Sequence, residues 1–236
     1  QNLKVFCPST IAVRLPSTPM DQTPDDCILR PTTMYGVTKV HTELLGEYYH
    51  RKFGVDFRSL RYPGVISNKT LPGGGTTDYA VDIYHEALAK GHFTCFLRSD
   101  SYLPMIYMPD LLKATWAMMD APNEKLKRRV YNLGGMSFTP AILAEAIQKE
   151  MPDFKIDYKV DFRQEIADTW PNSIDDSNAS NDWGWKADYN INSMTKHMLE
   201  CLGAQRLAAG LPRVFDPTQV PSSSSKSSKS KKISTQ

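Results

Sequence analysis

Tyr35 and Lys39 lie four residues apart, in a stretch whose apolar residues recur at helical spacing. A helix places positions i and i+4 on one face, so the phenol and the ammonium can act on the same substrate atom. An unperturbed tyrosine has a pKa of about 10, and an ammonium close by favours the phenolate. A phenolate in this position takes the proton from an alcohol while hydride leaves the same carbon. The pair therefore indicates alcohol oxidation, although a Tyr and a Lys at this spacing also occur by chance on solvated helices.

Two predicted strands flank this helix in the sequence. Residues 3–7 have the composition of a short buried strand, and the hydroxyl residues Ser9 and Thr10 follow it. Residues 55–62 predict a second strand, which ends at Pro63 and Gly64 in a turn that exposes backbone groups. Open parallel sheets present their catalytic groups at the carboxyl ends of strands, so we expect both segments near the Tyr–Lys pair.

The remaining chain predicts alternating helices and strands. Thr139 followed by Pro140 predicts the start of one helix, with Thr139 as its cap. The predicted helices span residues 35–53, 77–90, 110–119, a segment from 140 onward, and 191–201, and the other predicted strands span 93–97, 130–133 and 155–160. This alternation indicates an α/β fold with a parallel sheet.

Composition sets the broad class of the chain. The 236 residues, 41% of them hydrophobic, are enough for one or two domains. The net charge is +2, and four lysines lie in the last eleven residues, so nucleic acid is not an expected partner. No run of eighteen apolar residues predicts a membrane helix. Neither the cysteines nor the histidines show metal-ligand spacing: Cys7, Cys27, Cys95, Cys201, His41, His50, His85, His92 and His197.

Several longer stretches carry a family resemblance. These are PSTIA, RPTTMYGVTKVHTELLGEYY, DFRSLRYPGVIS, PGGGTTDYAV, MSFTP and DDSNASNDWGW, which together cover most of residues 2–200. They resemble the L-threonine 3-dehydrogenase family of extended short-chain dehydrogenases, whose relatives include sugar-nucleotide epimerases and dehydratases. The resemblance implies NAD as cofactor and oxidation of L-threonine at C3 to 2-amino-3-oxobutanoate. It also implies a homodimer and a mitochondrial location.

The same resemblance implies a fold and a domain division. The fold is the carboxy-terminal part of a doubly wound, Rossmann-type parallel sheet with a smaller α/β substrate domain. Residues 1–67 would belong to the dinucleotide-binding domain and residues 68–215 mainly to the substrate domain, with 110–134 returning to the Rossmann sheet. Residues 216–236, rich in Ser and Lys, are expected to be disordered.

The resemblance assigns a role to each catalytic candidate. Tyr35 becomes the general base, and Lys39 favours its phenolate and holds the nicotinamide ribose. Thr10 hydrogen-bonds the substrate oxygen, with Ser9 as the alternative because the register at a strand end is easily misjudged by one residue. Gly64 and Val65 match the positions where the backbone meets the nicotinamide carboxamide.

The glycine run at residues 73–75 is the candidate for binding the substrate carboxylate. Free backbone N–H groups near a helix start, with the hydroxyls of Thr76 and Thr77 alongside, suit a carboxylate. Thr76 is the preferred contact. The alternative is that the glycines only form a turn and that Thr77 caps the following helix.

Two departures from the family pattern bear on activity. No G-x-G-x-x-G turn follows a strand near the start of the chain, so we expect the dinucleotide-binding half to be incomplete, by about a hundred residues at about 30 per βαβ unit. Where the family has Ile-Gly-Ala-Phe-Gly-Pro, this chain has residues 11–16 as Ile-Ala-Val-Arg-Leu-Pro. Leu15 at a positive φ would cost about 1–2 kcal/mol. A sugar-nucleotide epimerase or dehydratase, and a non-catalytic remnant that acts as a binding partner, therefore remain alternative hypotheses.

Overall fold

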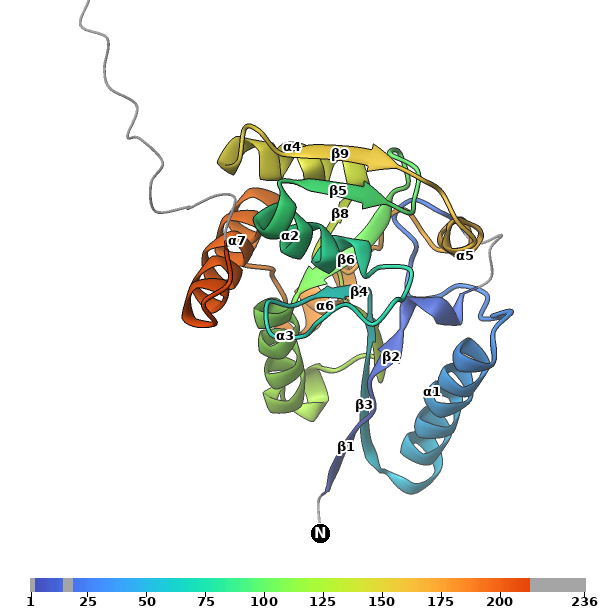
Figure 1. Cartoon of the computed structure of the whole chain (residues 1–236). Coiled ribbons are helices and arrows are strands. Elements are labelled where there is room, and N and C mark those ends of the chain that lie inside the picture. Colours follow the sequence, from blue (N-terminus) through green and yellow to red (C-terminus); the bar gives the residue numbers. More distant parts are fainter. Residues whose placement is uncertain (1–2, 15–18, 213–236) are drawn as a thin grey trace, which may run out of the picture.

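Within the described part of the chain, the central sheet has four strands and contains the segment before Ser9 and Thr10. A computed structural model of the chain describes residues 3–14 and 19–212, so the expectations for Leu15 and for residues 216–236 lie outside the described residues. β3 (Asp56–Tyr62) lies in the middle of this sheet (Figure 1). β1 (Lys4–Phe6) and β2 (Ser9–Thr10) pair with β3 on one side, and β7 (Val130–Asn132) pairs with it on the other. All three pairings are parallel.

β1 and β2 form one interrupted edge along β3. Lys4 pairs with Asp56 and Ser9 pairs with Arg61, and both pairs are separated by 52 positions (56 − 4 and 61 − 9), so the register is the same. The interruption falls at Cys7 and Pro8, where proline has no N–H to donate. Ser59 fills the gap, because its hydroxyl donates to the Cys7 carbonyl at 2.7 Å.

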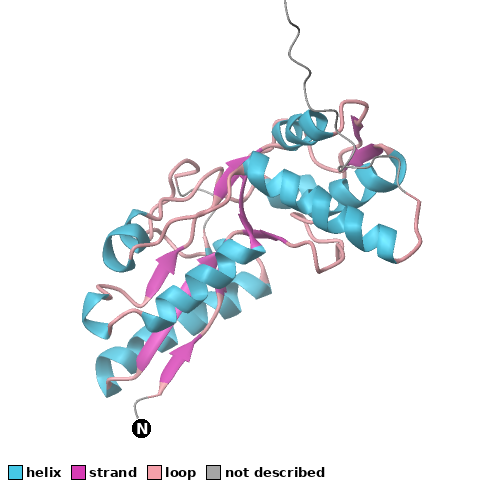
Figure 2. Ribbon diagram, turned by 90° about the vertical axis from the view of Figure 1, so that its left-hand side faces the viewer, coloured by secondary structure: helices cyan, strands magenta, loops and turns pink. Residues whose placement is uncertain are grey.

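Helices cover both faces of this sheet (Figure 2). α1 (Met34–Phe53) packs on one face, where Gly46 lies against the ring of Phe57. α3 (Met108–Asp120) packs on the other, where the Arg58 guanidinium donates to the Met118 and Ala121 carbonyls at 2.5 and 2.7 Å. A cation at the carboxyl end of a helix donates to the free carbonyls and is attracted to the negative end of the helix dipole. This explains why Arg58 is tolerated inside a central strand.

A second part of the molecule is built from short strands and the larger hydrophobic core. β4 (Gly64–Ile66) pairs in parallel with β6 (Leu103–Tyr107), and β6 pairs antiparallel with β8 (Met136–Phe138). β5 (His92–Cys95) and β9 (Lys155–Tyr158) form a two-stranded parallel sheet. The helices around this core are α2 (Tyr79–Lys90), α4 (Pro140–Glu150) and α7 (Ile191–Ala208). Two shorter helices, α5 (Arg163–Ala167) and α6 (Ser177–Trp183), and two 3-10 helices, η1 (Ile11–Val13) and η2 (Asn123–Lys125), complete the fold.

Most of the predicted elements are confirmed, with differences at their ends. α1 and α4 begin as expected, and the Thr139 hydroxyl caps α4 by accepting from Ile142 N. α7 continues to Ala208, beyond the predicted end at Cys201. The expected parallel pairing is found in the central sheet, in β4–β6 and in β5–β9, whereas β8, which the sequence did not predict, runs antiparallel to β6. Within the described residues, no helix is long and apolar enough to cross a membrane.

Candidate active site

The start of α1 places Tyr35 at the carboxyl edge of the central sheet. Thr33 is the N-cap, and its hydroxyl accepts a hydrogen bond from Gly36 N at 3.1 Å. The first N–H groups of a helix have no partner within the helix, and this cap satisfies one of them. The cap therefore fixes the first turn of α1, from which the Tyr35 side chain projects. The Tyr35 side chain is 55% exposed. Its phenol is therefore accessible to a small molecule.

Gly36 brings this helix end against the segment that follows Thr10. A Cβ on Gly36 would lie 2.6 Å from the backbone oxygen of Ala12 and 2.4 Å from Cβ of Pro31. Real Cβ contacts are not that short, so no larger residue fits without moving η1 or α1. The glycine inside the Y-x-x-x-K motif thus sets the distance between Tyr35 and the hydroxyl pair.

Lys39 lies one turn further along α1 and faces the same edge. Its ammonium lies 5.7 Å from the centroid of the Tyr35 ring and donates to the Pro8 carbonyl at 2.7 Å. Pro8 separates β1 from β2, so this bond ties the helix to the strand that carries the hydroxyls. The structure therefore brings together Tyr35, Lys39 and the end of β2, as the sequence predicted.

Ser9 and Thr10 differ in how their hydroxyls are used. Ser9 is 5% exposed, and its hydroxyl donates to Glu43 Oε1 at 2.5 Å, so its proton is committed inside the protein. Thr10 is half-buried, and its hydroxyl accepts from Ala12 N at 3.2 Å as the cap of η1. The Thr10 proton is not used in that bond. This difference favours Thr10 over Ser9 as the donor to a substrate oxygen, which stays a prediction.

A buried network of charged side chains lies behind these residues, and no sequence pattern predicts it. Arg61 donates to both carboxylate oxygens of Glu43, at 3.0 and 2.8 Å, and their side chains are 6% and 2% exposed. Burial acts to lower the pKa of Arg61, but the hydrogen bonds and charge of Glu43 together raise it. Because β3 carries Arg61 and α1 carries Glu43, the pair locks the helix to the sheet beside Ser9.

Arg14, directly after η1, extends this network toward β7. It is 4% exposed and donates to Asn132 Oδ1 at 2.5 Å, to Pro24 O at 2.9 Å and to Cys27 Sγ at 2.9 Å. Its Nε has no hydrogen-bond partner among the described residues. Burial is the largest cause that lowers the pKa of Arg14 to about 10, and Cys27 acts in the opposite direction.

A cavity of about 310 Å³ opens beside Tyr35. One wall comes from η1, Arg14 and the start of α1, and the other comes from α5 and the two residues Thr169 and Trp170. The residues that line it are Ala12, Arg14, Thr32, Thr33, Tyr35, Glu165, Ile166, Thr169 and Trp170. Sequence reasoning missed the second wall, since nothing in residues 165–170 marks them as partners of a helix 130 positions earlier.

Gly64 and Thr77, expected on the cofactor side and the substrate side, lie against each other. A Cβ on Gly64 would lie 2.7 Å from Cγ2 of Thr77 and 2.4 Å from the sulfur of Met105. The predicted end of the strand before Pro63 is confirmed, because β3 ends at Tyr62, but the sequence did not predict the new strand β4, which begins at Gly64 and contains Val65. The chain changes sheets here, between the central sheet and the β4–β6–β8 sheet.

The glycine run 73–75 is arranged differently from the expectation. The Asp78 carboxylate accepts from Gly73 N at 2.6 Å and from Gly75 N at 2.9 Å, so these two N–H groups are not free for a substrate. Thr77 does not cap α2, because the helix begins at Tyr79 with Asp78 at the N-cap position. Thr76 is 7% exposed and is not among the residues that line the cavity at Tyr35. Its role in substrate binding stays a prediction.

The chain is similar to known proteins in sequence and in fold. The profile of the NAD dependent epimerase/dehydratase family matches residues 4–134. The chain is 52% identical to the mitochondrial L-threonine 3-dehydrogenase of Bos taurus over 88% of its own length and 56% of the bovine protein. It is 50% identical to an uncharacterized epimerase/dehydratase of Staphylococcus saprophyticus, over 87% of this chain and 65% of that protein.

The fold of the chain is also similar to that of a solved structure. The L-threonine dehydrogenase of Phytophthora infestans superposes with a TM-score of 0.85 at 63% identity, over 86% of this chain and 66% of that one. The chain thus spans little more than half the length of its bovine relative. From the family profile, the matched relatives and the Tyr–Lys pair at the sheet edge, we conclude that the chain belongs to the NAD dependent epimerase/dehydratase family.

Proposed function

We propose that the protein containing this chain oxidises L-threonine at C3 to 2-amino-3-oxobutanoate. The observation that carries the proposal is the position of Tyr35, which lies at the wall of a small cavity with Lys39 one turn away and β2 beside it. The relatives that match most of the chain at 52% and 63% identity are named as threonine dehydrogenases, which supports this substrate.

The proposed roles follow from the contacts of each side chain. Tyr35 accepts the proton of the C3 hydroxyl, and the Lys39 ammonium stabilises the phenolate that is ready to accept it. Thr10 donates its free proton to the same substrate oxygen. Thr76 and Thr77 remain the proposed contacts of the substrate carboxylate.

We propose NAD as the cofactor, and the residues present fit its nicotinamide end. Where the chain passes between the two sheets, Gly64 is buried against Thr77 and Met105, and Val65 beside it is half-buried. Lys39, Gly64 and Val65 would hold the ribose and carboxamide. When bound, NAD supplies the acceptor for the hydride that leaves C3.

The phosphates of NAD need a different set of contacts. Dinucleotide pyrophosphates are bound by a glycine-rich turn at a helix start in a βαβ unit. Among the described strands, β1 pairs with β3 alone, so its other edge can accept a further parallel strand. We propose that a glycine-rich unit joins the sheet at this edge, and that residues 1–236 without it are inactive.

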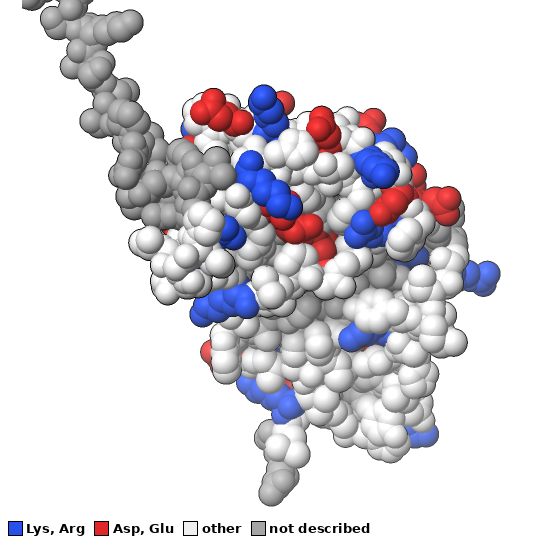
Figure 3. Space-filling view, viewed as in Figure 1, with Lys and Arg blue, Asp and Glu red and all other residues white. Residues whose placement is uncertain are grey.

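The outer face of α1 supports a homodimer as part of the proposal. Five apolar side chains on this helix are 44–55% exposed: Val37, Leu44, Leu45, Tyr48 and Tyr49. Figure 3 shows few charged side chains over α1 at the lower right, whereas charges of both signs gather over the β5–β9 region at the top. An exposed apolar helix face of this kind is typical of an interface between subunits.

A mitochondrial location is also proposed, by likeness to the mammalian relatives.

A sugar-nucleotide epimerase is less well supported by the cavity. Such a substrate carries a diphosphate, which arginines bind with two parallel hydrogen bonds. Arg14 is the one arginine that lines the cavity, and its terminal nitrogens are committed to Asn132, Pro24 and Cys27. The cavity of about 310 Å³ also suits an amino acid better than a nucleotide sugar.

The proposed function is tested by threonine-dependent NADH formation in the full-length protein and in its Tyr35→Phe variant. Removing the phenolic proton acceptor lowers turnover by about 100-fold or more with little change in NAD affinity, since a base acts mainly in the transition state. Thr38→Ala is the control, because Thr38 is an exposed residue of the same helix, and this variant should keep most of the activity. Unchanged turnover in Tyr35→Phe removes Tyr35 from the mechanism.

A further inference from the structure

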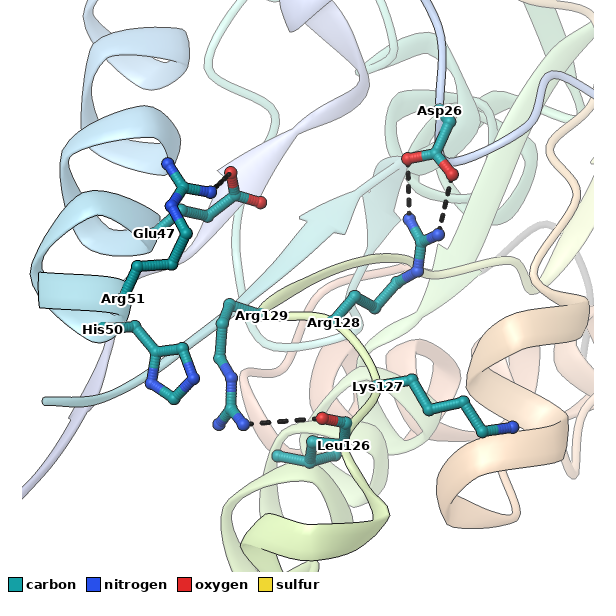
Figure 4. A pocket seen from close by; sticks show the side chains of 8 residues that line it. All are labelled: Asp26, Glu47, His50, Arg51, Leu126, Lys127, Arg128 and Arg129. Carbon is teal, nitrogen blue, oxygen red and sulfur yellow. Dashed lines mark hydrogen bonds and ion pairs between the residues drawn. The ribbon is translucent and has the colours of Figure 1, made fainter. Parts of the chain in front are cut away.

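A second cavity lies at the far end of α1 from Tyr35. It measures about 330 Å³ and is formed by α1, the loop before β7 and Asp26 (Figure 4). His50 and Arg51 come from the last turns of α1, fifteen residues after Tyr35, which is about 22 Å along the helix axis. The cavity therefore lies toward the amino ends of the strands, away from the catalytic edge.

The side chains that line this cavity carry an excess of positive charge. Four are cationic, Arg51, Lys127, Arg128 and Arg129, and two are acidic, Asp26 and Glu47, so the lining has a charge of +2 (4 − 2) with His50 neutral. Figure 4 shows His50 and Arg51 on one side and Arg128 and Arg129 on the other, while Lys127 extends away toward α6. Lys127 pairs there with Asp182 at 3.0 Å.

The ion pairs that Arg51 and Arg128 already form are weak enough for a multiply charged anion to replace them. Arg51 approaches Glu47 only to 3.6 Å, and its side chain is 68% exposed. Arg128 donates to both oxygens of Asp26, at 3.1 and 2.8 Å, but the Asp26 side chain is 86% exposed. Exposed ion pairs contribute about 0–1 kcal/mol, so an anion with more charge can displace them.

Arg129 and His50 form the more fixed part of the cavity. Arg129 is 9% exposed and donates to Asn123 Oδ1 at 2.7 Å. Its guanidinium also lies 3.5 Å from Asp56 Oδ1, and burial lowers the pKa of Arg129 while Asp56 acts to raise it. His50 Nδ1 lies 2.8 Å from the Val55 carbonyl, which holds the ring in place and leaves Nε2 for another contact.

We propose that this cavity is a binding site for a phosphate group with two or more negative charges, such as pyrophosphate or a phosphate monoester. Several acceptor oxygens on one small ion can contact arginines from both walls at once, which a single carboxylate cannot do. The volume excludes a whole dinucleotide and suits a small phosphorylated metabolite. A ligand there joins the end of the catalytic helix to the loop before β7.

Calorimetric titration of the full-length protein with inorganic pyrophosphate tests the site. We expect saturable binding that Arg128→Ala weakens by about tenfold or more, because hydrogen bonds between charged groups are lost. Asp26→Asn tightens binding, because it removes the carboxylate that competes for Arg128. The opposite signs separate a real site from a loss of folding, which weakens binding in every variant.

The matched control is Arg98→Ala. Arg98 also forms an exposed two-bond pair, with Asp168 at 3.1 and 2.7 Å, but it does not line this cavity. It should leave pyrophosphate binding unchanged. Separate titrations with orthophosphate and with adenosine monophosphate show whether a free ion or an ester is preferred, and binding of either supports the site.

Four results overturn the proposal. They are no saturable binding of any of the three probes, an equal loss in Arg98→Ala, weaker binding in Asp26→Asn, and competition by NAD. The last would mean that pyrophosphate occupies the cofactor site. None of these readouts depends on threonine oxidation, so they stand apart from the proposed function.

Discussion

Replacing Glu43 by alanine tests whether the buried ion pair holds α1 on the central sheet. Glu43 is 2% exposed and accepts from Ser9 and from two nitrogens of Arg61. Its loss leaves Arg61 charged and buried. Breaking such a pair costs about 3–5 kcal/mol. Arg61 keeps its bond to the Asp25 carbonyl at 2.7 Å, so we expect a loss of about 3 kcal/mol, at the lower end of that range.

The assay is urea and thermal unfolding of the variant beside a matched control. For a chain of this size the loss corresponds to a fall in Tm of about 6–12 °C. Glu47→Ala is the control, one turn later on α1, because its pair with Arg51 is exposed and long at 3.6 Å. It should cost about 0.5 kcal/mol or less. A loss in Glu43→Ala no larger than in the control would refute the locking role of the pair.

Three further changes probe the site and the sheet. Lys39→Met should lower the turnover of threonine, because the cation beside the Tyr35 ring and its 2.7 Å hydrogen bond to the Pro8 carbonyl are both lost; unchanged turnover would remove Lys39 from the proposed mechanism. Gly36→Ala should lower stability by about 1–3 kcal/mol in urea unfolding, because the new Cβ meets the Ala12 oxygen at 2.6 Å; a neutral result would mean that η1 yields easily. The hydrogen bond from Arg58 holds the pKa of Asp56 below its usual value. Its stabilisation is therefore present above about pH 4 and lost as pH falls through the lowered folded pKa, so Asp56→Asn should lose less Tm on acidification than the parent.

Sequence periodicity predicted the helices well because they carry their own signals. Thr139 and Pro140 mark the start of α4, and Gly54 at φ 69° ends α1. The short strands β6 and β8 were missed, since a strand of five buried residues and a strand of only three residues leave no period to count. The position of β3 in the middle of the sheet comes from its pairing with β1, β2 and β7, which are far from it in the sequence, and the carbonyls of α3 satisfy its buried Arg58.

The contact between Tyr35 and Lys39 was predictable from the sequence, and the surroundings of the pair were not. Tyr35 and Lys39 are linked by local helix geometry, which spacing reveals. Trp170 on the opposite wall is brought there by tertiary packing across 135 positions (170 − 35), which no local pattern encodes. The glycine run misled for a related reason, because Asp78, close by in sequence, takes the N–H groups that the motif left open.

Transfer of a labelled hydride tests the proposed chemistry most directly. L-Threonine deuterated at C3 is incubated with NAD and the full-length protein, and the reduced cofactor is analysed by mass spectrometry. We predict that the cofactor gains one deuterium and that Tyr35→Phe nearly abolishes its formation. Unlabelled reduced cofactor, or none at all from an enzyme that binds NAD, would contradict hydride transfer from C3 of threonine.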